Sequence, residues 1–287
     1  MIGAWPARLG ISLEGRETPA EVAAIAAATE AGGAGTLWVA SHLFLRDPVT
    51  LALVALGATH RIRVALVAMS PYAVHPVPIA MAAATLDAMS GGRLDLGIGV
   101  GAYREEFAAW APRLAPRAHR GGMVGEAVAM ISALFTEDRV TFTGTYYACR
   151  DVAMAPKPVQ SPLPLYAGGH TLACVERSAA HGRDPSAIEV APQFSVTVAR
   201  TMEAAEARHM ASDLVTHRVS LAFTGRDQSK QVVANLVGSP DVIREKVAAL
   251  AAIGVQHCCG LMFPADTLAE YREQVAWFAE VVGLPRG

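Results

Sequence analysis

One histidine stands directly after a short apolar run in this 287-residue chain, where it could act in proton transfer. His42 follows the run 36–40. An imidazole with an unperturbed pKa of about 6.5 suits general acid or base work at neutral pH. A structural histidine that caps the next loop explains the position equally well. His42 is the candidate catalytic residue.

Three further segments have the composition of ligand-binding turns. The run GIGVGAYREEF, residues 97–107, brings backbone within reach of a ring or a phosphate, and Gly168-Gly169 before His170 can open a phosphate-binding helix. Both could equally be plain strand-to-helix turns. The segment LVAMSPY, residues 66–72, could form a flat wall for an aromatic ring, although such residues are more often core.

Motifs for metal or nucleophilic chemistry are missing from the sequence. It contains no HExxH, no paired CxxC, no Walker loop and no GxSxG. The nine histidines are scattered without the spacing of a metal site, so we expect no metal. The cysteines are expected to be reduced and buried. They are Cys149, Cys174, Cys258 and Cys259.

Apolar runs and Ala-rich stretches alternate along the chain, the pattern of a parallel sheet covered by helices. A hairpin is expected around Gly144. The expected strands are 8–13, 36–40, 61–68, 93–100, 163–167, 188–199 and 256–263. The expected helices begin at 18, 48, 75, 120, 172, 202 and 239, and a last helix closes the chain.

This alternation, without a linker, favours a single α/β domain over residues 1–287, a (β/α)8 barrel of the TIM type. An open doubly wound sheet is the alternative. That fold would carry a glycine fingerprint after its first strand, where Gly10 and Gly15 make no such loop. In a barrel the active site lies at the carboxyl ends of the strands, where His42 and the glycine turns fall.

Charge and hydropathy exclude several classes of partner. A net charge of -2 without a Lys/Arg run argues against a nucleic-acid groove or a polybasic membrane patch. Prolines interrupt the most apolar window, 64–84, whereas a spanning helix needs roughly 20 apolar residues without interruption. Arg8, Glu14 and Arg16 stand where a secretory peptide would be apolar, so we expect a cytoplasmic protein.

Three segments together resemble the bacterial luciferase-like monooxygenase superfamily and, within it, the F420-dependent oxidoreductase group. They are ASHLF at 40–44, the run from His75 to Phe107, and PKPVQSPLPLYAGG at 156–169. Members are TIM barrels, commonly homodimers, that bind the deazaflavin coenzyme F420 or reduced FMN at the strand carboxyl ends. The resemblance therefore implies hydride transfer between F420 and a small organic substrate that the variable loops do not identify. The alternatives are an FMN-dependent monooxygenase and a shortened barrel with weak or no cofactor binding and a non-catalytic role.

The resemblance also assigns roles to residues. His42 matches the histidine of the family's Asp-His pair, thought to act as a base, although Ser41 replaces the acid. Leu66 and Val67 match a third-strand bulge that holds a non-prolyl cis peptide against the cofactor ring. The remaining cofactor contacts implied are Val100 and Gly101 at the ring and ribityl chain, and Gly168, Gly169 and His170 at the phosphate.

One departure from the family concerns chain length after the fifth strand. Only one short helix fits between Gly169 and Gly182, where relatives place roughly a full strand and helix. The comparison implies a barrel shortened by one β/α unit. Because strand number and barrel size are linked, we expect seven strands and an edge covered by a loop or a dimer partner.

Overall fold

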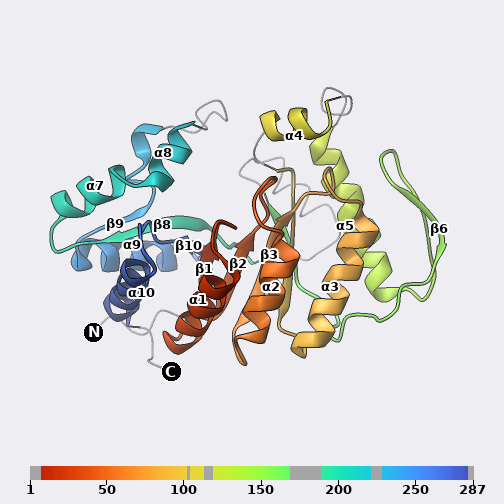
Figure 1. The fold of residues 1–287 in the computed structure, drawn as a ribbon, viewed down its shortest axis with the longest axis horizontal. Helices are drawn as coiled ribbons and strands as arrows, with labels where there is room; N and C mark the ends of the chain where they lie inside the picture. The colour runs from red at the N-terminus through yellow and green to blue at the C-terminus, as the bar shows by residue number, and fades with distance from the viewer. Residues whose placement is uncertain (1–7, 102–103, 113–118, 169–188, 221–227, 284–287) are drawn as a thin grey trace. The chain divides into compact units, whose positions relative to one another are not determined.

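The protein divides into two compact units by its internal contacts. A computed structural model describes residues 8–101, 104–112, 119–168, 189–220 and 228–283. The first unit comprises Met1–Leu13, Glu17–Trp38 and Glu189–Gly287, and the second comprises Glu14–Arg16 and Val39–Ile188. In both units strands alternate with helices along the chain (Figure 1).

The first unit contains strands in the order β2-β1-β10-β8-β9, and β1, β10, β8 and β9 pair in parallel. Strand β2 continues into the second unit. The elements are β1 (Arg8–Leu13), α1 (Pro19–Ala31), β2 (Thr36–Ala40), β8 (Gln193–Val198), α7 (Met202–Met210), α8 (Asp213–Ser220), η4 (Gln228–Lys230), β9 (Leu236–Gly238), α9 (Pro240–Ala252), β10 (His257–Met262) and α10 (Leu268–Val282).

The second unit contains strands in the order β7-β4-β3-β2, with β3, β4 and β7 parallel, and a separate antiparallel hairpin of β5 and β6. The hairpin predicted around Gly144 is thus confirmed. The elements are α2 (Pro48–Gly57), β3 (Arg63–Met69), α3 (Pro76–Ser90), β4 (Leu94–Gly99), α4 (Arg104–Trp110), α5 (Arg120–Thr136), β5 (Val140–Thr143), β6 (Ala148–Val152) and β7 (Leu165–Gly168).

The predicted α/β class is confirmed, but the predicted strand count is wrong. The main sheet of the described chain has eight strands, not seven. The stretch after the fifth strand where a β/α unit was expected to be missing lies outside the described residues, so the shortening stays a prediction. The extra strand is β9, which has only three residues, all buried. Three residues are too few to show a periodic pattern, which is why the sequence did not reveal it. The helix expected at 172 lies outside the described residues.

Side-chain caps and prolines fix where helices α1 and α2 begin. Thr18 accepts a hydrogen bond from the Glu21 amide while the Glu21 side chain accepts one from the Thr18 amide, a complete capping box. Asp47 caps α2 in a similar way through the Thr50 amide. A proline in the first turn follows each cap, because it lacks the N–H that a helix start leaves unpaired.

Helices α2 and α3 lie side by side (Figure 1), and both carry exposed apolar side chains. Leu53 on α2 is 41% exposed, and Met81 and Met89 on α3 are 55% and 66% exposed. Apolar residues occur on every face of α3, which is typical of a helix buried on every side. That interpretation is wrong for the face that carries Met81 and Met89, because nothing in the described part of the chain covers it.

A buried polar network joins the amino ends of β3 and β4. Arg63 Nε donates to Asp95 Oδ1 at 2.9 Å, and Arg63 Nη2 also reaches Gln160 Oε1 at 2.7 Å. The Gln160 amide nitrogens donate in turn to the Asp87 carboxylate. Asp87 and Asp95 are both fully buried. Each buried carboxylate therefore has a strong donor, as burial of a charge requires.

A second polar network lies in the first unit. His257 is fully buried, with Nδ1 3.0 Å from Glu189 Oε1 and Nε2 3.1 Å from Thr36 Oγ1. Burial raises the pKa of Glu189, but hydrogen bonds from His257 and Arg8 outweigh it and lower that pKa to about 2. Glu189 is therefore ionised at neutral pH and holds the His257 ring in place.

Two of the three described cysteines are buried, as expected. Cys258 and Cys259 are buried free thiols, and burial raises the pKa of Cys258 to about 12. Cys149 is also a free thiol but is half-buried, and Cys174 lies outside the described residues. A thiol held neutral in this way is a poor nucleophile and a poor metal ligand.

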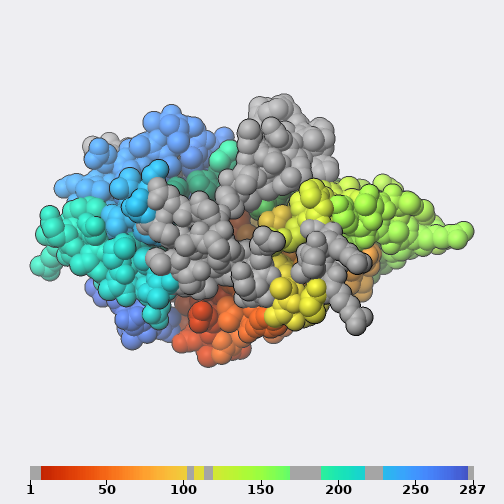
Figure 2. Space-filling view, turned by 90° about the horizontal axis from the view of Figure 1, so that it is seen from above, coloured from red at the N-terminus to blue at the C-terminus, as the bar shows by residue number. Residues whose placement is uncertain are grey.

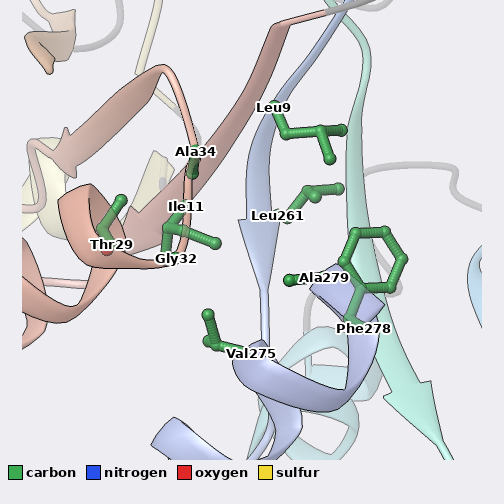
Figure 3. Close-up of a pocket in the computed structure, with 9 residues that line it drawn as sticks. All are labelled: Leu9, Ile11, Thr29, Gly32, Ala34, Leu261, Val275, Phe278 and Ala279. Atoms are coloured by element: carbon green, nitrogen blue, oxygen red, sulfur yellow. The ribbon is translucent and has the colours of Figure 1, made fainter. Parts of the chain in front are cut away.

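The described residues offer no second site of obvious function. A small pocket in the first unit is apolar throughout (Figure 3). Within the described ranges no cluster of three or more His, Cys, Asp or Glu side chains could hold a metal, and no helix has the length and hydropathy to cross a bilayer. The residues lining the pocket are Leu9, Ile11, Thr29, Gly32, Ala34, Leu261, Val275, Phe278 and Ala279.

The buried network predicts a large stability effect at Arg63. We expect Arg63→Met to lower the free energy of unfolding by about 3–5 kcal/mol, because it leaves Asp95 charged and buried. The control is Arg139→Met, which breaks the pair with Asp151 whose side chains are 61% and 63% exposed. That change should cost far less, because an ion pair exposed to water on both sides contributes little to stability. Equal losses in urea denaturation would contradict this interpretation of the network.

Candidate active site

The described candidate residues all lie in the second unit, at the carboxyl ends of neighbouring strands. The Ser41 amide, one residue before His42, donates to the Val67 carbonyl at 3.0 Å. Gly99 and Gly168 stand opposite each other in the pairing of β4 with β7. The ends of β2, β3, β4 and β7 thus bring the predicted residues to one edge of the sheet, where α/β proteins bind their ligands.

Strand β3 is irregular at the place that the resemblance indicates. Its pairing with β4 shifts register between Leu66 and Met69, and the peptide bond between Val67 and Ala68 is cis. The bulge is therefore confirmed, with the cis bond following Val67. Leu66 is buried, whereas Val67 and Ala68 are half-buried. The contact of Leu66 and Val67 with a cofactor stays a prediction.

The strand glycines make room for this bulge. A Cβ on Gly99 would lie 2.7 Å from the Ala68 Cβ, and one on Gly168 would lie 3.4 Å from it. A Cβ on Gly97 would come within 3.1 Å of Val67 Cγ2. Glycine at these positions therefore lets β4 and β7 approach β3 closely. This packing role is additional to the ligand role that the sequence suggested.

The turn after β4 is held by an arginine. Arg120 Nη1, at the start of α5, donates to the carbonyls of Val100 and Gly101, at 3.2 Å each. Gly101 has a φ of +72°, and a side chain there would overlap the Phe107 ring. The Arg120 guanidinium carbon lies 5.4 Å from the centre of that ring. Gly101 is thus required by the turn itself, and its contact with a cofactor stays a prediction.

The hairpin β5–β6 projects beyond α5 (Figures 1 and 2) but is tied back at its tip. The Glu126 carboxylate accepts hydrogen bonds from the amides of Thr145, Tyr146 and Tyr147, at 2.7 to 3.1 Å. Burial raises the pKa of Glu126, yet these bonds outweigh it and hold the pKa below its usual value. Tyr147 then donates its phenol proton to the Pro71 carbonyl at 2.6 Å, which fixes the loop after β3.

Two hydroxyl groups in that loop have no hydrogen-bond partner among the described residues. They are Ser70 Oγ and Tyr72 Oη, on side chains whose residues are 8% and 5% exposed. An unpaired buried hydroxyl costs about 1–3 kcal/mol. Two of them lie within three residues, directly after a strand at the candidate site, and the described residues supply neither with a partner.

The surface around the bulge suits a flat ring. Val67, Ala68, Val100, Gly101 and Gly168 are half-buried, small or medium-sized, and uncharged. No long side chain on these residues keeps a planar ligand from the backbone. Together with the unpaired hydroxyls, these small uncharged residues fit a tricyclic flavin or deazaflavin ring.

Most of the predicted site residues come together, and three further residues lie next to them. His42, Leu66, Val67, Val100, Gly101 and Gly168 lie at one end of the strands, whereas Gly169 and His170 fall outside the described residues. Ser70, Tyr72 and Arg120 were not identified. The polar types in the otherwise apolar MSPY segment were a usable signal for the first two, but nothing local marked Arg120.

The chain belongs to the luciferase-like monooxygenase family, because residues 3–182 match the profile of that family. A curated relative, the F420-dependent glucose-6-phosphate dehydrogenase of Kineococcus radiotolerans, is 32% identical over 57% of this chain and 52% of its own. The chain thus spans about half the length of the curated relatives it matches.

Solved structures share the fold over almost the whole chain. The monooxygenase RslO1 from Streptomyces bottropensis superimposes with a TM-score of 0.79 at 21% identity, covering 95% of this chain and 98% of its own. An F420-dependent secondary alcohol dehydrogenase, solved with an F420-acetone adduct, gives 0.80 at 19% identity, covering 98% and 99%. Identities this low establish the fold alone, and the near-complete coverage agrees with the eight strands counted above.

The close approach at the bulge predicts a specific coupling. Gly99→Ala should lower stability by about 1–3 kcal/mol, because its methyl group would overlap that of Ala68. Adding Ala68→Gly should return part of the loss. The control is Gly57→Ala, where nothing lies within 4 Å of the new methyl group. Thermal unfolding of the wild type, Gly99→Ala, Ala68→Gly and the double variant measures the coupling, and purely additive effects would show that the two positions do not compete for space.

Proposed function

We propose that this protein is an F420-dependent oxidoreductase that moves a hydride between the deazaflavin and a small organic substrate. The observation that carries the proposal is the family match over residues 3–182, together with the gathering of the matched candidate residues at one edge of the sheet. The named functions of the curated relative and of the alcohol dehydrogenase neighbour support F420 over FMN.

The cofactor ring would lie against the bulge of β3 and the turn after β4. Val67 and Leu66 would back the ring, Val100 and Gly101 would border it, and Gly168 with Gly169 and His170 would approach the phosphate. When bound, the deazaflavin supplies a carbon that accepts or donates a hydride. The Arg120 bonds to the Val100 and Gly101 carbonyls would hold this border in place before binding.

His42 would accept the proton that this reaction releases. When a carbon bearing a hydroxyl group is oxidised, a hydride leaves the carbon and a proton leaves the oxygen. An imidazole nitrogen of His42 would take that proton as a general base. The names of both relatives, a sugar phosphate dehydrogenase and a secondary alcohol dehydrogenase, support a substrate with such a carbon.

Cofactor titration and one variant test the proposal. We expect purified protein to bind F420, and His42→Ala to lose at least about tenfold in turnover while its affinity for F420 changes little. His60→Ala, an exposed histidine before β3, is the control. The substrates tried are 2-propanol and glucose 6-phosphate. Tight binding of FMN without F420 would favour a flavin monooxygenase, and binding of neither would remove the enzymatic assignment.

We also propose that the protein forms a homodimer through the apolar face of α2 and α3. The exposed Leu53, Met81 and Met89 and the lack of exposed charges on both helices support this. Light scattering should give twice the chain mass of 30.1 kDa. Met81→Glu should shift the protein to monomer, whereas Val159→Glu, at a similarly exposed position elsewhere, should not. A wild-type monomer would contradict the proposal.

A further inference from the structure

We propose that the Ser70 and Tyr72 hydroxyls hydrogen-bond a carbonyl-type oxygen of the ligand bound at the end of β3. This inference rests on the proposed function, since it assumes a ligand at that edge of the sheet. Neither residue belongs to the set that the resemblance indicated. The oxygen belongs either to the cofactor ring or to the substrate, and the experiment below separates the two.

Burial without a partner is the first observation. Ser70 and Tyr72 are 8% and 5% exposed, and neither hydroxyl finds an acceptor or donor within the described chain. Other buried hydroxyls nearby are satisfied, as the Tyr147 phenol is by the Pro71 carbonyl. Buried polar groups are paired as a rule, so two unpaired neighbours point to a partner that arrives with the ligand.

The loop that carries these groups is rigid, which is the second observation. The Ser70 carbonyl accepts hydrogen bonds from the amides of Ala73 and Val74, at 3.0 Å each. Pro71, between the two hydroxyls, is tied to Tyr147 at 2.6 Å. The ring of Tyr147 also packs edge-on against His75, with centroids 5.3 Å apart. The unpaired hydroxyls are therefore held in place and not merely caught in a loose loop.

The surroundings of Tyr72 define what it can bind. Its ring packs edge-to-face against Phe107, with centroids 4.6 Å apart. Burial raises the pKa of Tyr72, partly offset by the charge of Arg120, so the phenol is neutral and carries its proton. A neutral phenol and a neutral alcohol next to a cationic side chain favour an oxygen acceptor over a cationic group.

Position links these hydroxyls to the reaction. Ser70 directly follows β3, and the bulge of β3 at Val67 and Ala68 is where the cofactor ring is proposed to bind. Tyr72 packs against Phe107, and Arg120 contacts Phe107 and binds the Gly101 carbonyl. The turn at Gly101 is the other proposed border of the ligand. Ser70 thus adjoins one proposed border of the ligand, and Tyr72 contacts a residue that packs against the other, so both donors are near a ring carbonyl or a substrate oxygen bound there.

The first arm of the test uses the protein without ligand. Tyr72→Phe removes an unpaired hydroxyl, so its melting temperature should equal or exceed that of the wild type. Tyr147→Phe is the matched control, a tyrosine of similar burial whose hydroxyl is bonded, and it should melt lower. A drop for Tyr72→Phe as large as that for Tyr147→Phe would show that its hydroxyl already has a protein partner, which overturns the proposal.

The second arm measures ligand binding by wild type, Tyr72→Phe and Ser70→Ala. Loss of one hydrogen bond should weaken binding about fivefold in each variant. Weaker binding of F420 alone assigns the oxygen to the cofactor ring. Acetone serves as a carbonyl probe for the substrate position. If a variant keeps its affinity for F420 but is inhibited less by acetone, the bonded oxygen belongs to the substrate.

The failures of the two proposals are distinguishable. If the wild type binds no F420, the proposed function fails and this inference fails with it. If the wild type binds F420 and acetone and both variants bind them equally well, only the hydroxyl assignment is overturned.

Discussion

The candidate site depends on the close approach of three strands around one methyl group. Ala68 lies in the bulge of β3, and its Cβ occupies the space that side chains on Gly99 and Gly168 would need. A methyl group on Gly99 would come within 2.7 Å of it and push β4 away, whereas one on Gly168 would just touch it at 3.4 Å. Because the same strands carry Val100, Gly101 and Gly168, the spacing of the whole surface follows from this contact. The glycines are thus structural first, whatever ligand they also admit.

A second layer of contacts holds the loops beyond the strands. Arg120 binds both carbonyls of the turn after β4, and Glu126, on the same helix α5, binds the three amides of the hairpin tip. Through Tyr147 the hairpin reaches the Pro71 carbonyl. One helix therefore organises two of the loops that border the site. The hairpin, an insertion on the rim, contributes to the position of Ser70 and Tyr72.

Several elements were predictable because their signals are local. The capping box at Thr18, the run from Arg93 into the GIGVG turn and the hairpin around Gly144 each appear in consecutive residues. Strand β9 was missed because three residues carry no period, so the predicted count of seven strands was one short. The uncovered face of α3 was missed because apolar residues all round a helix predict burial whether or not another element covers it.

Hydrophobic periodicity and contiguous motifs were enough to predict the α/β class, the order of most elements and the family. The folded chain was needed to see that Gly99 and Gly168 meet Ala68, that Arg120 closes the turn at Gly101, and that Ser70 and Tyr72 are buried without partners among the described residues. These facts join residues far apart in the chain. Their energies arise from packing distances and unmet hydrogen bonds, which no local pattern encodes.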